Sequence, residues 1–149
     1  ALPIFYPMSP EVFLSVAHYT HSVAPHQRRV TVVASGVLQL SDFKKLMESP
    51  RQDPAFDETF DILYDFTAVS NIAVSPLQAY QLARMDFDAP KGLRVVAAPK
   101  DVVYGVCRAI SAYLPAEDAA RFFIFRSLPE ALQHLATPAP RPNAEALHI

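Results

Sequence analysis

The segment DILYDFTAVSNIAVSPLQAYQLARM, from Asp61 to Met85, decides the fold. The run FDILYDF at residues 60–66 is rich in aromatic and branched aliphatic side chains, which are the types that strands favour. The residues that follow are smaller and more polar. We therefore predict a buried strand at 60–66, followed by a loop or extended link at 69–74.

The second half of this segment predicts the start of a helix. Ser75 is a preferred cap residue, Pro76 suits the first helical position, and Gln78 can complete a capping box. Leu77 and Tyr80 are expected on the apolar face of this helix, because they are three residues apart. The segment thus reads as strand, short loop and helix.

On either side of this segment, hydrophobic periodicity and turn residues predict the other elements. Strands are predicted at 11–18, 30–37, 93–98 and 121–126, and helices at 42–48 (capped by Ser41), 102–114 and 128–135. A polar turn at 20–28 makes the first two strands antiparallel neighbours. The later strands alternate with helices, which is typical of right-handed crossovers and parallel pairing. We therefore predict an α/β fold with a single mixed, mostly parallel sheet of about five strands and helices packed on it, in the order β-β-α-β-α-β-α-β-α.

The chain has 149 residues, which is the size of one domain. Residues 11–135 carry the predicted elements and form that domain. Residues 1–10 are expected to be an N-terminal arm, and the proline-rich residues 136–149 a disordered tail. No apolar run approaches the roughly 18 residues that span a bilayer, so no transmembrane segment is expected.

Composition excludes several classes of partner. The net charge of −2 provides no basic field for a nucleic-acid backbone. With 14 prolines and 3 glycines, the chain has no glycine-rich phosphate loop, and we expect no cofactor. The single cysteine, Cys107, is expected to pack in the core. It rules out an internal disulfide and fits a reducing compartment, so a cytoplasmic location is expected.

Residues 65–77, DFTAVSNIAVSPL, resemble the signature of STAS domains, the fold of bacterial anti-anti-sigma factors and of the cytosolic parts of sulfate transporters. That signature reads Asp-Leu-Ser-Gly-Val, two variable residues, an aliphatic position, then Asp-Ser-Ser-Gly-Leu. Four residues match it outright, namely Asp65, Val69, Ser75 and Leu77.

The resemblance extends over residues 12–135. Near its end, Phe125-Arg126 and Glu130-Ala131-Leu132 are similar to STAS-like bacterial proteins that also resemble CRAL-TRIO lipid-transfer domains. The resemblance implies a non-enzymatic bacterial regulatory or protein-interaction module, whose partner is another protein or a second copy of the chain. The CRAL-TRIO likeness implies the alternative, a carrier or sensor of a small apolar or lipid ligand.

In the anti-anti-sigma factors a partner kinase phosphorylates the second serine of the signature, and the resemblance places that position at Ser75. The chain departs from the signature at Ala73, Val74 and Pro76. Proline adds bulk and removes an N–H where the family has glycine. A plain helix cap is therefore the alternative interpretation of Ser75. The interaction surface that the comparison implies comprises Asp65, Thr67, Ser70, Asn71, Ser75, Pro76 and Gln78.

Other residues with possible chemistry have structural interpretations. His18, His21 and His26 have a spacing that zinc could use, but no fourth ligand is close, so a polar surface turn is favoured over a metal site. Asp61 and Asp65 share one face of their strand, where a structural role is favoured over acid–base work. No Ser-His-Asp or Cys-His arrangement can be argued from spacing, so no enzyme is predicted.

Aromatic residues provide the last candidate site. They are the phenylalanines of the run 122–125 together with Tyr64, Tyr80, Tyr104 and Tyr113. These residues could line an apolar ligand pocket, with a packed core as the alternative.

The strand near 12–18 is expected to be an exposed edge that can pair with a second copy of the chain.

Overall fold

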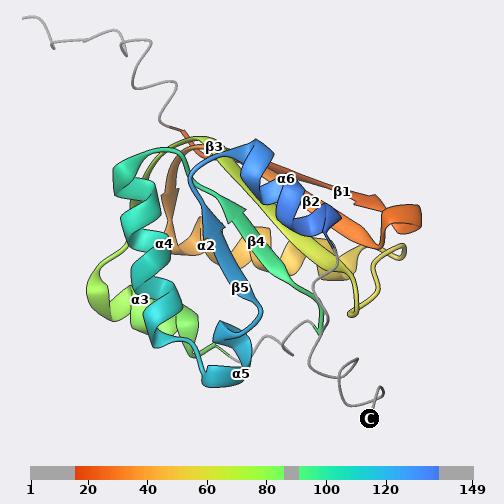
Figure 1. Cartoon of the computed structure of the whole chain (residues 1–149). Helices are drawn as coiled ribbons and strands as arrows, with labels where there is room; N and C mark the ends of the chain where they lie inside the picture. Colours follow the sequence, from red (N-terminus) through yellow and green to blue (C-terminus); the bar gives the residue numbers. More distant parts are fainter. Residues whose placement is uncertain (1–15, 86–90, 138–149) are drawn as a thin grey trace, which may run out of the picture.

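The computed structural model describes residues 16–85 and 91–137 of the chain. They contain one five-stranded sheet in the order β1-β2-β3-β4-β5 (Figure 1). β1 pairs antiparallel with β2, and the other neighbours pair in parallel. The predicted α/β fold with a single mixed, mostly parallel sheet is confirmed. The strands are β1 (His18–Ala24), β2 (Arg29–Gln39), β3 (Asp61–Ala73), β4 (Arg94–Ala97) and β5 (Phe122–Phe125).

Helices connect the parallel strands in the predicted order, with one additional helical turn, α5, before the last strand. The predicted arm at 1–10 and residues 138–149 of the predicted tail lie outside the described residues. The helices are α2 (Leu40–Glu48), α3 (Pro76–Ala83), α4 (Asp101–Tyr113), α5 (Ala116–Ala119) and α6 (Leu128–Ala136), with short 3-10 helices η1 (Pro25–Gln27) and η2 (Ser49–Gln52).

The two faces of the sheet are covered by different helices. α2, α3 and α4 contribute Phe43, Leu82 and Val103 to the larger hydrophobic core. α6 packs on the opposite face, where Ala131 contacts a smaller core that includes Leu63 (Figure 1). Right-handed crossovers that always step in one direction put their helices on the same face of a sheet, which explains why α2, α3 and α4 lie together.

β3 is longer than predicted. Most of the segment 69–74, predicted as a loop or link, continues the strand to Ala73 and pairs with the second half of β2. Val69 and Ile72 are buried in the larger core. Pairing along the long β2 and burial of these two side chains outweigh the low strand preference of the polar residues between them.

Two register shifts interrupt the pairing of β2 with β3. One follows Asp65, whose carboxylate accepts hydrogen bonds from the backbone N–H of Thr67 at 3.0 Å and from its hydroxyl at 2.6 Å. The other lies beside Gly36, whose φ of 81° is rare for residues with a side chain. Asp65 is predicted to end the strand and cap the following loop, and this prediction is wrong because β3 continues to Ala73. Its carboxylate instead makes the contacts with Thr67 beside an irregularity within the strand.

β1 lies further along the chain than predicted. The predicted strand at 11–18 falls mostly outside the described residues, and β1 begins at its last residue and runs into the predicted turn at 20–28. The actual turn is only η1 and Arg28, which has a left-handed conformation with φ of 50°. Polar residues are tolerated in β1 because one face of this antiparallel edge strand is exposed.

α2 also begins earlier than predicted. Its first residue is Leu40, and the carboxylate of Asp42 accepts the backbone N–H of Gln39 at 2.8 Å. Ser41, predicted as the cap, lies inside the first turn and is exposed. Asp42, the third residue of the helix, therefore supplies a cap contact that the sequence predicts for Ser41.

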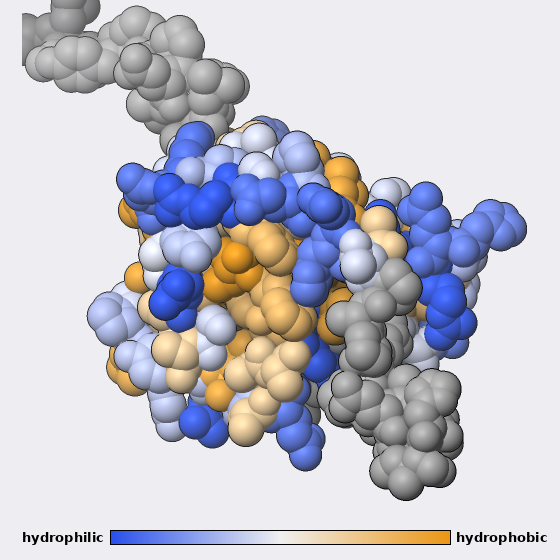
Figure 2. All heavy atoms as spheres, viewed as in Figure 1, coloured by the Kyte–Doolittle hydropathy of each residue, from blue (hydrophilic) through white to orange (hydrophobic). Residues whose placement is uncertain are grey.

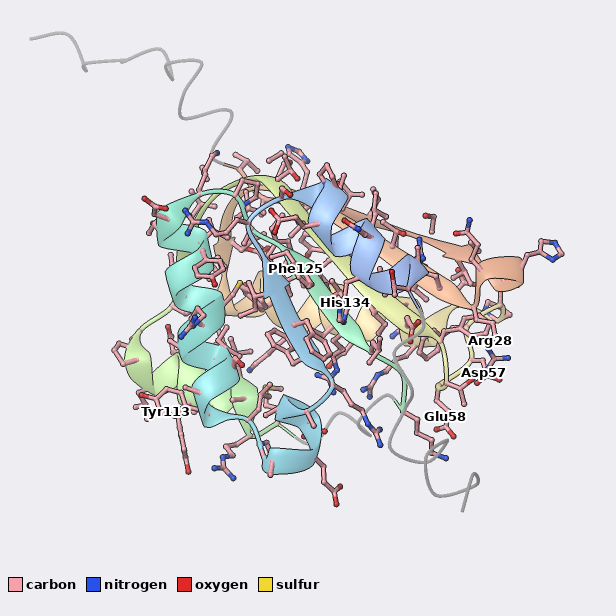
Figure 3. The ribbon with its side chains drawn as sticks, in the orientation of Figure 1. Arg28, Asp57, Glu58, Tyr113, Phe125 and His134 are labelled. Carbon is pink, nitrogen blue, oxygen red and sulfur yellow. The ribbon has the colours of Figure 1, made fainter. Side chains whose placement is uncertain are left out.

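β5 forms the second edge of the sheet. All four of its residues are half-buried, and Figure 2 shows apolar side chains gathered over this strand between α4 and α6. His134 of α6 covers part of it, with ring centroids 4.4 Å from Phe123 and 5.2 Å from Phe125 (Figure 3). This edge is apolar, whereas the β1 edge is polar.

Candidate functional site

An apolar pocket lies between the sheet and the three helices of the larger core. Its cavity volume is about 60 Å³, and it is partly open to solvent. Protein interiors contain few voids larger than a water molecule, so a cavity of this size is an unusual gap in the packing and a candidate entry point for a small ligand. The apolar lining includes Phe43, Leu46, Phe66, Leu82, Val96 and Ile110.

The pocket lies toward the amino ends of the parallel strands. Arg94 and Phe122, the first residues of β4 and β5, line it, as do Leu114 just after α4 and Asp118 of α5. In open α/β sheets, ligands usually bind at the carboxyl ends, where the strand order reverses. β2 to β5 follow one another without such a reversal. A second, more open pocket does lie at the carboxyl ends of β2 and β3, where its lining includes Gln39, Ala73 and Gln78.

Two polar side chains reach this pocket from neighbouring strands. Tyr64 of β3 is only 6% exposed, and its hydroxyl has no hydrogen-bond partner among the described residues. Burial raises the pKa of Tyr64 above its ordinary value of 10.0, and the charges of Arg94 and Arg51 oppose that rise. The hydroxyl is therefore neutral near pH 7, and Arg94 lies within electrostatic reach of it.

Cys107 of α4 also lines the pocket. It is buried, and burial raises the pKa of its thiol to about 12. The thiolate is the nucleophilic form of cysteine, so this side chain is inert at neutral pH. The packing role predicted for Cys107 is confirmed.

The residues of the predicted interaction surface are spread along β3. Asp65 and Thr67 lie at the bulge, whereas Ser70 and Asn71 lie near the carboxyl end of the strand. Strand residues rise about 3.3 Å each, so Ser70 lies roughly 10 Å beyond Thr67 and the end of β3 roughly 20 Å beyond it. The set is therefore extended along β3 and is not gathered at one point.

Ser75, Pro76 and Gln78 form the start of α3, as predicted. The side chains of Ser75 and Gln78 each accept the backbone N–H of the other residue, and Pro76 is the first helical residue. Ser75 and Pro76 are exposed. This end of α3 lies past the carboxyl end of β3, while Leu82 and Ala83 at its other end line the pocket.

The apolar face predicted for α3 is wrong. Leu77 is 64% exposed and Tyr80 is 45% exposed, whereas Ala79, Leu82 and Ala83 are buried. α3 packs mainly against α4, so its buried side is the side that faces α4 and the pocket. Leu77 and Tyr80 consequently form an exposed apolar surface near Ser75.

The structure also creates an arrangement that the sequence does not predict. Nδ1 of His21 on β1 lies 2.8 Å from the hydroxyl oxygen of Ser49, and Nε2 lies 3.1 Å from a carboxylate oxygen of Asp53. The pKa of Asp53 is held below its ordinary value of 3.8, mainly by a hydrogen bond from the backbone N–H of Ala55 and to a smaller extent by the hydrogen bond with His21. In a catalytic triad, a serine nucleophile, a histidine base and an aspartate that orients the histidine are linked in the same order as Ser49, His21 and Asp53. These residues do not line the pocket, however, and they join the edge strand to η2.

The three histidines considered for zinc are not brought together. His18 and His26 are exposed, while His21 is directed toward Ser49 and Asp53. Across residues 16–85 and 91–137, no three potential metal ligands gather at one point.

No protein-family model matches this chain, and no curated protein is significantly similar to it. In the described part of the chain, no helix has the length and apolar character needed to cross a membrane. The pocket and the outer surface of α3 are therefore interpreted from their own geometry and chemistry.

Proposed function

We propose that the protein is a non-enzymatic binding module that holds a small apolar ligand in the pocket between its sheet and α2, α3 and α4. The observation that carries this proposal is an apolar cavity of about 60 Å³ within the larger core, which is partly open to solvent. Met47 and Met85, whose flexible side chains adapt to different shapes, are part of the lining. A carrier or a sensor would both use a site of this kind.

Binding fits the pocket better than catalysis does. The one thiol among the described lining residues, Cys107, is neutral because burial raises its pKa to about 12. The Ser49, His21 and Asp53 contacts lie outside the lining. We therefore propose that the ligand is held and released unchanged.

A pocket-filling substitution tests this proposal. Ala83 is buried in α3 and lines the pocket, so Ala83→Phe should occupy part of the space. The neutral fluorescent probe N-phenylnaphthylamine should bind the wild type and bind Ala83→Phe at least tenfold more weakly. Gln81→Phe adds the same ring to an exposed position of the same helix and should leave binding unchanged. Equal binding by all three proteins, or no binding by the wild type, would reject the pocket as a ligand site.

A second proposal is that the module acts through protein contacts, as the STAS resemblance implies. The exposed Leu77 and Tyr80 beside Ser75 support it, because exposed apolar side chains that cluster are typical of interaction sites. The partner would be another protein or a second copy of the chain, in the bacterial cytoplasm. α3 would then contact a partner on its outer side and the ligand through Leu82 and Ala83.

Light scattering tests self-association through this surface. If a second copy binds here, the wild type should have the mass of a dimer, and Leu77→Asp should have the mass of a monomer. Val102→Asp is the matched control, because Val102 is an exposed apolar residue of α4, 51% exposed. A monomeric wild type, or a dimer that survives Leu77→Asp, would exclude self-association through α3.

A further inference from the structure

The pocket is lined by a tyrosine hydroxyl that is not engaged by any described residue. Tyr64 is 6% exposed, and the described residues supply no acceptor or donor for its oxygen. This oxygen is not fully enclosed, because among the described residues Arg29 Nε is the one fully buried side-chain nitrogen or oxygen atom without a partner. A ligand that accepts a hydrogen bond from this hydroxyl would replace solvent there.

The same pocket contains a positive charge without a counter-ion. Arg94 is half-buried at the start of β4, where its neighbours in the sheet are Ile62 of β3 and Phe122 of β5. It forms no ion pair with any described residue. Among apolar neighbours, a guanidinium is best satisfied by a planar anion that accepts two of its N–H groups.

One acidic side chain, Asp118 of α5, also belongs to the described lining. It makes no ion pair with Arg94. Its carboxylate would repel an anionic ligand, so it acts against binding rather than for it. Among the described lining residues, the charges are therefore one cation that can hold an anion and one anion that weakens its binding.

We propose that the ligand is an amphiphilic monocarboxylate, with its carboxylate between Arg94 and Tyr64 and its apolar body along the lining. This inference rests on the proposed function and adds the chemical class of the ligand. The carboxylate would accept hydrogen bonds from the guanidinium and from the tyrosine hydroxyl. Hydrogen bonds of this charge-assisted kind are about twice as strong as neutral ones. The apolar wall by itself would not distinguish an acid from the alcohol of the same length.

A matched pair of ligands tests the inference. Octanoate and octan-1-ol have the same chain length and differ in the head group. Their affinities for the wild type are measured by isothermal titration calorimetry at pH 7. The binding free energy of a hydrogen bond to a charged group corresponds to a change in affinity of about tenfold or more. Octanoate should therefore bind at least tenfold more tightly than octan-1-ol.

Three variants assign this preference to individual side chains. Arg94→Gln should weaken octanoate far more than octan-1-ol, so that the preference is lost, and an unchanged far-UV circular dichroism spectrum would report that the fold is intact. Tyr64→Phe should weaken octanoate several-fold, and Asp118→Asn should strengthen it. Arg108→Gln, at an exposed position of α4 outside the pocket, is the matched control and should have no effect.

Each outcome separates the two proposals. Equal affinities of the wild type for both compounds would overturn the carboxylate assignment and leave the apolar pocket in place. So would an Arg94→Gln variant that keeps the preference, or that loses affinity for both compounds equally. If the wild type binds neither compound nor N-phenylnaphthylamine, the proposed function fails together with the inference.

Discussion

Ser75 and Gln78 exchange two hydrogen bonds at the start of α3. The backbone N–H of Ser75 donates to Oε1 of Gln78 at 2.9 Å, and the backbone N–H of Gln78 donates to Oγ of Ser75 at 3.1 Å. Ser75 is exposed. Its hydroxyl already has a structural role, because it accepts the backbone N–H of Gln78. Phosphorylation of Ser75, which the STAS resemblance implies, stays a prediction.

Removing this cap should destabilise the protein. Ser75→Ala is expected to lower the free energy of unfolding by about 1 kcal/mol, because an N–H at the start of α3 loses its acceptor. Ser75→Asp should retain most of the stability. Urea denaturation measures both variants. Ser41→Ala is the control, since Ser41 precedes a helix in the prediction but does not cap it in the structure, and its effect should be small.

Two glycines should respond in opposite ways to alanine. A Cβ at Gly92 would lie 2.3 Å from the backbone oxygen of Phe60, so Gly92→Ala forces the backbone to move and should destabilise the fold. Gly105 lies within α4 with nothing within 4 Å of such a Cβ, so Gly105→Ala should stabilise the fold by about 0.5–1 kcal/mol. Thermal unfolding compares them directly. The same sign of effect for both variants would contradict the packing described around Phe60.

Tyr64→Phe should not destabilise the ligand-free protein. The substitution keeps the ring and removes a hydroxyl that is not fully enclosed and makes no hydrogen bond to a described residue. Loss of a satisfied hydroxyl would instead cost about 1 kcal/mol. Urea denaturation of ligand-free Tyr64→Phe should give a midpoint equal to or above that of the ligand-free wild type. A clear decrease in the midpoint would mean that the hydroxyl has a hydrogen-bond partner.

The contact between His21 and Asp53 should contribute to the acid sensitivity of the fold. The folded-state pKa of Asp53 is lowered from 3.8, mainly by the N–H of Ala55 and then by His21. Its contribution to stability is therefore fully present above that ordinary value and is lost as the pH falls through the lowered folded-state pKa. Asp53→Asn should be less stable than the wild type at neutral pH but should lose less stability on acidification.

Denaturation midpoints between about pH 6 and about pH 2 measure this effect. The matched control is Glu117→Gln, which changes an exposed carboxylate and should follow the wild-type pH profile. If the stability of Asp53→Asn falls with pH in parallel with that of the wild type, the contacts of Asp53 do not contribute to the pH dependence of stability.

Much of the parallel half of the sheet could be predicted from the sequence. The strands at 93–98 and 121–126 and the start of α3 are confirmed to within one or two residues. Their boundaries are local, because proline, capping serines and short apolar runs determine where they begin and end. The cap formed by Ser75 and Gln78 was predictable for the same reason.

The errors arise where distant contacts decide the structure. β3 continues through 69–74 because β2 is long enough to pair with it, and β1 is a strand because it follows one edge of β2. Leu77 and Tyr80 are exposed because α3 packs on α4 and not flat on the sheet. None of these relationships has a local signal in the sequence.

The candidate site was only partly predictable. Tyr64 is among the aromatic residues expected in a pocket or core, but Arg94 carries no signal that separates it from other surface cations. It meets the pocket because the parallel register sets it between Ile62 and Phe122. The chain of contacts at His21 is hidden for a similar reason, since its members are 28 and 32 residues apart.

The measurement that tests the central claim most directly is an amide and methyl NMR titration of the wild type with octanoate. If the pocket is the binding site, the shifted resonances will be those of its lining, such as Ala83, Val96 and Ile110, and octan-1-ol will shift the same resonances at higher concentration. Shifts confined to the exposed residues Leu77 and Tyr80, or no shifts at all, would contradict the account.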